Sequence, residues 1–151
     1  MSDFAIVSAG GAAALTQNFA AIVGDDGDVA VTITGINDAN DDLSSVDNIS
    51  ALNLICARTT GTVTASISAD KSIVGNLSVN SIPRTLTITV SDRMSVSEFN
   101  VLNAKTSVNI ILTSGLEDSL GSLCPSGTVA GGVTNAMTQD ADANVVVTGT
   151  V

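Results

Sequence analysis

The chain has 151 residues, of which 44% are apolar and only 2% are aromatic; it has fifteen acidic residues, five basic residues, no histidine and a formal net charge of −10. This length allows one domain with a buried core, and the acidic balance disfavours nucleic acid and anionic membranes as partners. The lack of histidine excludes hydrolytic triads and imidazole zinc sites. The sequence also has no G-x-S-x-G motif or P-loop, so we expect no enzymatic activity.

Residues 1–28 contain a predicted strand, FAIVS, at 4–8 and an Ala-rich helical stretch, AAALTQNFAAIV, at 12–23. No lysine or arginine precedes Arg58, so this segment lacks the basic region of a cleaved secretory signal. Polar residues and glycines interrupt its apolar run, so we expect no membrane insertion. We expect residues 1–28 to form an N-terminal cap or a subunit-linking arm.

The next part of the chain predicts a strand, VAVTITG, at 29–35, a short helix, SVDNISALNLICART, at 45–59, and a second strand, GTVTASI, at 61–67. The segment between the first strand and the helix contains NDANDD. This places Asp38, Asn40 and Asp42 at the alternate positions of an oxygen-ligand calcium loop. However, Leu43 and Ile49 stand where an EF-hand needs glycine and a bidentate glutamate. A solvated Asp/Asn turn is therefore the favoured interpretation, with calcium as the alternative and no other cofactor expected.

The same order of elements recurs farther along the chain. Residues 85–90, TLTITV, alternate as a strand does, and residues 108–113, VNIILT, predict another strand. Between them lies SVSEFNVLNAKT, in which Ser95 and Glu98 have the spacing of a capping box. Val96, Phe99 and Leu102 then recur at helical spacing and predict a buried stripe, with Val101 as a further candidate. Residues 68–84 join the two units across about the space that a helix would fill.

The two predicted helices share a pattern, S-V-x-x-[IF]-x-x-L-N followed by A-[RK]-T. In the first copy the matching residues are Ser45, Val46, Ile49, Leu52, Asn53, Ala57, Arg58 and Thr59. In the second they are Ser95, Val96, Phe99, Leu102, Asn103, Ala104, Lys105 and Thr106. The first copy carries three additional residues, Leu54 to Cys56. The match involves chemically different positions, so we interpret the two segments as copies of one unit.

Strands that begin near residues 29, 61, 85 and 108, each continued by a helical or irregular return, predict an α/β fold. We expect a short right-handed β/α solenoid-like repeat over 29–113, with a parallel sheet and short helices. A single α/β layer is the alternative. Residues 114–151 are rich in Gly, Ser and Thr, with a late strand, NVVVTGTV, and they predict a C-terminal cap or arm within one overall domain. Glu117 and Asp118 are expected in a solvated turn.

Two further patterns have minor implications. Cys56 and Cys124 lie 68 residues apart without a C-x-x-C motif, which favours two buried free thiols over a disulfide or a zinc site. Thr-x-Thr pairs suggest a threonine ladder of the kind that binds ice, a remote alternative to threonine on the wet face of half-buried strands. These pairs are Thr32/Thr34, Thr62/Thr64, Thr87/Thr89 and Thr148/Thr150.

The segments LTITVSD, SVSEFNVLNAKTSV and TGTVTASIS resemble a repeat of giant cyanobacterial cell-surface proteins and of structural proteins of cyanobacterial phages. The resemblance covers roughly residues 29–113 and departs from the repeat at Leu54–Cys56 and at the Asp-rich turn. It implies a structural or adhesive role and supplies no catalytic residues. Together with the lack of a secretory signal, it favours a capsid decoration or appendage subunit located in the virion. The alternative is a secreted cyanobacterial adhesin module at the cell surface, stabilised by calcium.

The charge pattern predicts how such a subunit would contact its neighbours. All five bases lie between Arg58 and Lys105, eight acids precede this zone, and four come after it. We expect partners that are other structural subunits, in a homo-oligomer or a capsid lattice. The acidic ends of one copy would then meet the basic central zone of the next, a contact that salt would weaken.

Overall fold

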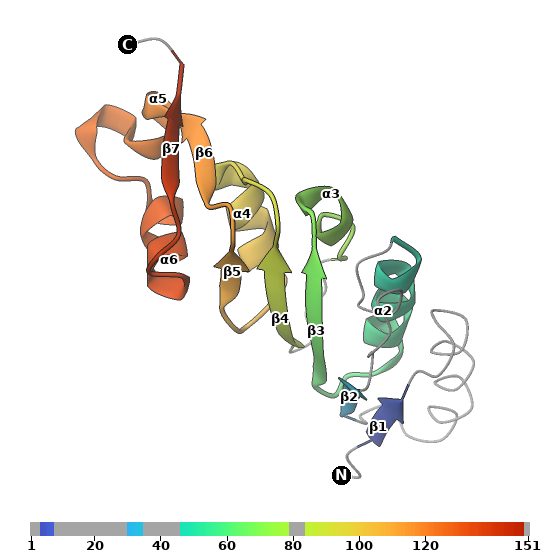
Figure 1. Ribbon diagram of the computed structural model, residues 1–151. Helices are drawn as coiled ribbons and strands as arrows, with labels where there is room; N and C mark the ends of the chain where they lie inside the picture. The colour runs from blue at the N-terminus through green and yellow to red at the C-terminus, as the bar shows by residue number, and fades with distance from the viewer. Residues whose placement is uncertain (1–3, 8–29, 35–45, 79–83, 150–151) are drawn as a thin grey trace.

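The computed structural model describes residues 4–7, 30–34, 46–78 and 84–149 (Figure 1). The predicted helix at 12–23 and the acidic segment with Asp38, Asn40 and Asp42 lie outside these residues. The elements, in chain order, are β1 (Phe4–Val7), β2 (Val31–Thr34), α2 (Val46–Arg58), β3 (Val63–Ala69), α3 (Lys71–Val74), β4 (Arg84–Val90), α4 (Val96–Asn103), β5 (Ile110–Leu112), β6 (Leu116–Ser119), α5 (Leu120–Leu123), a 3-10 turn η1 (Pro125–Gly127), α6 (Gly131–Gln139) and β7 (Val145–Thr148).

The strands form two parallel sheets. The first contains β1 to β5 side by side in chain order, and the second contains β6 and β7. Helices α2, α3 and α4 lie against one face of the first sheet (Figure 1). The predicted α/β class with parallel strands and short helices is therefore confirmed, because each strand leads into a return that begins the next strand in the same direction.

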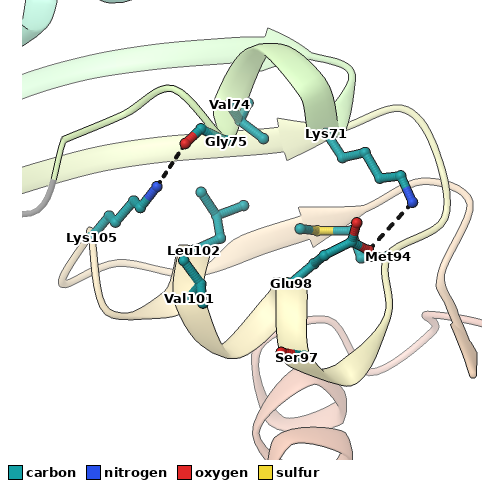
Figure 2. Close-up of a pocket in the computed structure, with 9 residues that line it drawn as sticks. All are labelled: Lys71, Val74, Gly75, Met94, Ser97, Glu98, Val101, Leu102 and Lys105. Carbon is teal, nitrogen blue, oxygen red and sulfur yellow. Dashed lines mark hydrogen bonds and ion pairs between the residues drawn. The ribbon is translucent and has the colours of Figure 1, made fainter.

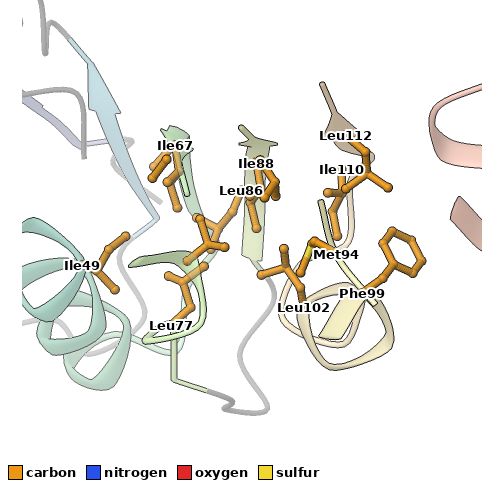
Figure 3. Packing of buried hydrophobic residues seen from close by; sticks show 14 of the residues in the cluster. Ile49, Ile67, Leu77, Leu86, Ile88, Met94, Phe99, Leu102, Ile110 and Leu112 are labelled. Carbon is orange, nitrogen blue, oxygen red and sulfur yellow. The ribbon is translucent and has the colours of Figure 1, made fainter. Parts of the chain in front are cut away.

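The strands alternate between a buried and an exposed face, as period-2 side chains require. On the inner face Ile67, Ile88 and Ile110 are in register across β3, β4 and β5, and all three are buried. The helices complete this core with Phe99 and Leu102 of α4 (Figure 3). The core is thus one continuous layer between the sheet and its helices.

The repeated helix pattern corresponds to a repeated packing pattern. Ile49 and Leu52 of α2 and the matching Phe99 and Leu102 of α4 are all buried. Val101, the further candidate for the stripe, is exposed. The [IF]-x-x-L spacing therefore places the two core residues of each unit on the side of the helix that faces the sheet.

The polar residues of the repeat join each helix to the next part of the chain. Thr59 Oγ1 accepts a hydrogen bond from Gly61 N at 3.0 Å, and Thr106 Oγ1 accepts one from Val108 N at 3.3 Å. Asn53 Nδ2 donates to the carbonyl oxygen of Asn76 at 2.8 Å. Asn103 Oδ1 accepts a hydrogen bond from the Gln139 side chain. The threonines close the turn into the next strand, while Asn53 binds the turn after α3 and Asn103 binds the end of α6.

The N-terminus of α4 has the predicted capping box. Ser95 Oγ accepts a hydrogen bond from Glu98 N at 3.2 Å, and Glu98 Oε2 accepts one from Ser95 N at 2.7 Å. We expect Ser95→Ala to lower the free energy of unfolding by about 1 kcal/mol, because it removes the cap. Ser97→Ala is the matched control on the exposed side of the same helix and should change stability by roughly 0.5 kcal/mol or less. Urea unfolding compares the two variants, and equal losses would contradict a capping role.

The predicted late strand of the C-terminal segment is present as β7, and the segment contains further regular structure that the sequence did not predict. Residues 116–119 form strand β6 rather than a solvated turn, and residues 131–139 form helix α6. Gly132 allows α6 to approach α4 closely, because a Cβ atom there would lie 2.7 Å from Val96 Cγ1 and from Asn100 Oδ1. The glycines that indicate a loop in the sequence thus serve helix packing in the fold.

Candidate functional site

The second sheet is attached to the first at a single described backbone bridge. Met94 N donates to the Gly115 carbonyl at 3.2 Å, and Glu117 N donates to the Met94 carbonyl at 2.8 Å. Leu116 N in turn donates to the carbonyl of Asn144 at 2.8 Å, which joins β6 to β7. The position of β7 therefore depends on a short chain of contacts that begins beside α4.

The two acids of β6 have structural partners. Glu117 Oε2 lies 2.8 Å from Arg93 Nη1 in an exposed ion pair. Asp118 Oδ2 accepts a hydrogen bond from Val96 N at 3.2 Å, at the start of α4. The backbone N–H of Ser119 and further hydrogen bonds hold the pKa of Asp118 below its usual value. Glu117 and Asp118 therefore hold β6 against the segment that leads into α4, and the expectation of a solvated turn at these residues was wrong.

Strand β7 presents an exposed edge. Val145 is 40% exposed and Val147 is 55% exposed. In a parallel ladder alternate residues bond to each neighbouring strand. Since the Asn144 carbonyl faces β6, the alternation turns the main-chain groups of Val146 toward β6 and those of Val145 and Val147 outward. Among the described residues, no side chain accepts a hydrogen bond from either outward amide.

The outer edge of β5 is treated differently. The outward amide of Ile110 donates to Gln139 Oε1 at 2.9 Å, and that of Leu112 donates to Asp140 Oδ2 at 2.6 Å. The side chain of Gln139 is itself held by Asn103. Side chains at the end of α6 therefore satisfy the edge that would otherwise bind another strand. Within the described part of the chain, the edge of β5 is closed and the edge of β7 is open.

Exposed apolar side chains gather in the same third of the chain. Of the eight large apolar residues that are exposed in the described part, five lie in 114–149. Strand β7 contributes two of the five, and α5, which contributes a third, contacts β7. These five are Leu120, Val129, Met137, Val145 and Val147. An open strand edge with exposed valines is a typical protein-contact surface.

A pocket of about 250 Å³ lies between α3 and α4 (Figure 2). Val74, Met94 and Leu102 give it an apolar lining. At one end Lys71 Nζ lies 3.3 Å from Glu98 Oε2, and at the other Lys105 Nζ donates to the Gly75 carbonyl at 2.9 Å. Lys105 is only 7% exposed. It therefore ties α4 to α3 instead of extending into solvent at the end of its own helix.

The charge of Lys105 destabilises the folded chain by an amount that depends on pH. Burial, and secondarily the nearby charge of Arg84, holds the pKa of Lys105 below its ordinary 10.5. In the window below 10.5 the unfolded chain therefore binds more protons than the folded chain, so this group raises stability as the pH rises through the window. At lower pH both states are protonated and the cost is fully present.

Lys105→Met tests this linkage. We expect the stability of the wild-type chain relative to Lys105→Met to increase as the pH is raised toward 10.5, as measured by urea unfolding at a series of pH values. Burial also raises the pKa of Cys56, but this contribution is common to both chains and cancels in the difference. A pH-independent difference would show that Lys105 is solvated in the folded chain.

The described bases do not form a free basic surface. Arg84 is 3% exposed, donates from Nη1 to the Ser78 carbonyl at 2.7 Å, and has no described partner at Nε or Nη2. Lys105 is buried as well, while Lys71 and Arg93 are in ion pairs with Glu98 and Glu117. Every basic side chain in the described part of the chain is therefore buried or in an ion pair, so none is free to bind the acidic end of another copy. The Arg58 side chain lies outside the description.

The face of the first sheet that no described helix covers carries hydroxyl groups. Thr32, Thr64 and Thr85 are in register across three strands. Farther along the strands, however, Ser66 and Ser68 of β3 stand opposite the threonines of β4. The predicted Thr-x-Thr ladder is thus interrupted by serines, and it ends at the exposed Ile111 of β5.

The remaining predictions concern the cysteines, a metal site and membrane insertion. Cys56 is buried and Cys124 is partly buried, and no disulfide joins them. Among the residues that the structure describes, no group of three or more His, Cys, Asp or Glu is placed to hold a metal ion. None of the helices in these residues is long and apolar enough to cross a membrane. Asp38, Asn40 and Asp42 lie outside the described residues, so the calcium hypothesis stays a prediction.

Comparison of the chain with protein-family models, with curated proteins and with solved structures finds no match. The proposed function therefore rests on the chain's own surfaces and on its sequence pattern.

Proposed function

We propose that this chain is a non-catalytic structural protein that works through protein–protein contacts, as a virion component such as a capsid decoration or appendage subunit. The observation that supports this most is the contrast between the two sheet edges. The amides at the edge of β5 are satisfied by Gln139 and Asp140, while the edge of β7 has no partner among the described residues and is lined with exposed valines. An open edge of this kind binds another strand.

The proposal includes a finer interpretation of the fold, a short right-handed β/α solenoid. Five adjacent strands in chain order with helices on one face support it, as does the repeated packing of Ile49/Leu52 and Phe99/Leu102. In a solenoid each unit contacts only its neighbours, and the outer faces of the end units must be covered. The open edge of β7 is then the end of a stack, ready to receive a further strand.

The virion assignment rests on the resemblance of residues 29–113 to repeats of cyanobacterial phage structural proteins. Its test is mass spectrometry of density-gradient-purified particles of a phage whose genome encodes the chain. We expect the chain in the particle fraction at a stoichiometry comparable to that of other structural proteins. Its absence from the particles, with recovery in the host envelope fraction, would support the secreted adhesin module instead.

A further inference from the structure

We propose that the partner of the open β7 edge is β1 of a second copy of this chain, so that copies associate head to tail by extending the parallel sheet. This deepens the proposed function and rests on it. The contact would be made by main-chain hydrogen bonds between the last strand of one copy and the first strand of the next.

The geometry of β1 matches this role. Val31 N donates to the Thr62 carbonyl on the β3 side, so the alternation of a parallel ladder turns the main-chain groups of Thr32 toward β1. Thr32 is opposite Ala5, which leaves the main-chain groups of Ala5 and Val7 pointing away from β2. Among the described residues no strand lies on that side of β1.

The direction of the strands favours β1 over a second β7 as the partner. Every strand pair in both sheets is parallel, and the bridge between Met94 and Leu116 is parallel too. A strand that continues this arrangement beside β7 must therefore run in the same sense, which a first strand does in a translated copy. Two β7 strands related by a two-fold axis would instead pair antiparallel. Head-to-tail contact is heterologous and produces open-ended chains of subunits.

The charges of the two ends predict that salt strengthens this association, whereas salt would weaken a contact between acidic ends and central bases. Residues 1–34 contain four acids and no base, and residues 114–151 also contain four acids and no base. Association of one end with the other is therefore opposed by repulsion and is strengthened by salt. Association of acidic ends with central bases would be weakened by salt.

Proline at an outward position tests the contact without breaking the strand's own ladder, because the lost amide faces away from the sheet. Val147→Pro blocks the edge of β7, and Ala5→Pro blocks the edge of β1. Val147→Thr and Ala5→Ser are matched controls that keep both amides. All are full-length chains, and circular dichroism melting verifies that each is folded. The readout is molar mass by light scattering over a range of protein and salt concentrations.

We expect the molar mass of the wild type and of both controls to rise above that of the 15.1 kDa monomer as the protein concentration and the salt concentration increase. Each proline variant alone stays monomeric, and an equimolar mixture of the two forms a species of twice the monomer mass that grows no further. The inference is overturned if Ala5→Pro associates as wild type does, which indicates β7–β7 pairing, or if wild type is monomeric throughout. In the latter case recovery of the chain from phage particles would leave the proposed function intact.

Discussion

Replacement of Gly115 by alanine is expected to lower the free energy of unfolding by about 3 kcal/mol and to release β7 from β6. Gly115 has a φ of +81°, in the left-handed region that costs an alanine about 1–2 kcal/mol. A Cβ atom there would also lie 2.0 Å from the carbonyl oxygen of Asn144, which is backbone and cannot rotate away. That carbonyl accepts the hydrogen bond from Leu116 that joins the two strands, so relief of the clash breaks the small sheet.

Gly127 provides the matched control. Its φ is +77°, but a Cβ atom there would meet nothing within 4 Å. We therefore expect Gly127→Ala to cost only the conformational term, roughly 1–2 kcal/mol. Chemical denaturation gives the two losses, and amide exchange at Val146 shows whether β7 has separated. Equal losses for the two variants would mean that the chain near Asn144 moves aside freely.

The second large effect is expected at Phe99. Its side chain is 0% exposed and is the largest fully buried side chain of the described core, where it packs beside Ile110 and Met94 (Figure 3). We expect Phe99→Ala to cost about 3–5 kcal/mol, because it removes a buried ring and leaves a cavity.

Val101 lies on the same helix and is 55% exposed. Val101→Ala should therefore change stability by about 0.5 kcal/mol or less. Urea unfolding of the two variants with the same slope against denaturant would make the comparison direct. A loss for Phe99→Ala no greater than that for Val101→Ala would contradict the position of α4 on the sheet.

The sequence predicted those elements that depend on residues close together in the chain. The Ser95/Glu98 spacing predicted the start of α4, and the alternation in TLTITV predicted β4 to within one residue. The duplicated pattern predicted that Phe99 and Leu102 are core residues, because helical periodicity alone determines which side of a helix is apolar.

The features that sequence reasoning missed depend on distant contacts. Lys105 is buried because the Gly75 carbonyl lies above it, thirty residues earlier in the chain. Gln139 and Asp140 close the edge of β5 from almost thirty residues away. Helix α6 has a glycine-rich start that is typical of a loop, and Gly132 is there because α4 leaves no room for a side chain. The one available signal for this helix was the pair Gly131–Gly132, followed by Val133 and Ala136 at helical spacing.

Amide hydrogen exchange tests most directly whether the chain works through the open edge of β7. In dilute monomer the outward amides of Val145 and Val147 should exchange rapidly, while the Val146 amide, bonded to β6, exchanges more slowly. In the assembled state, whether with further copies or within a particle, we expect the exchange of Val145 and Val147 to slow by about tenfold or more. Assembly that leaves both amides as fast as in the monomer, with protection on another surface, would contradict a role for this edge.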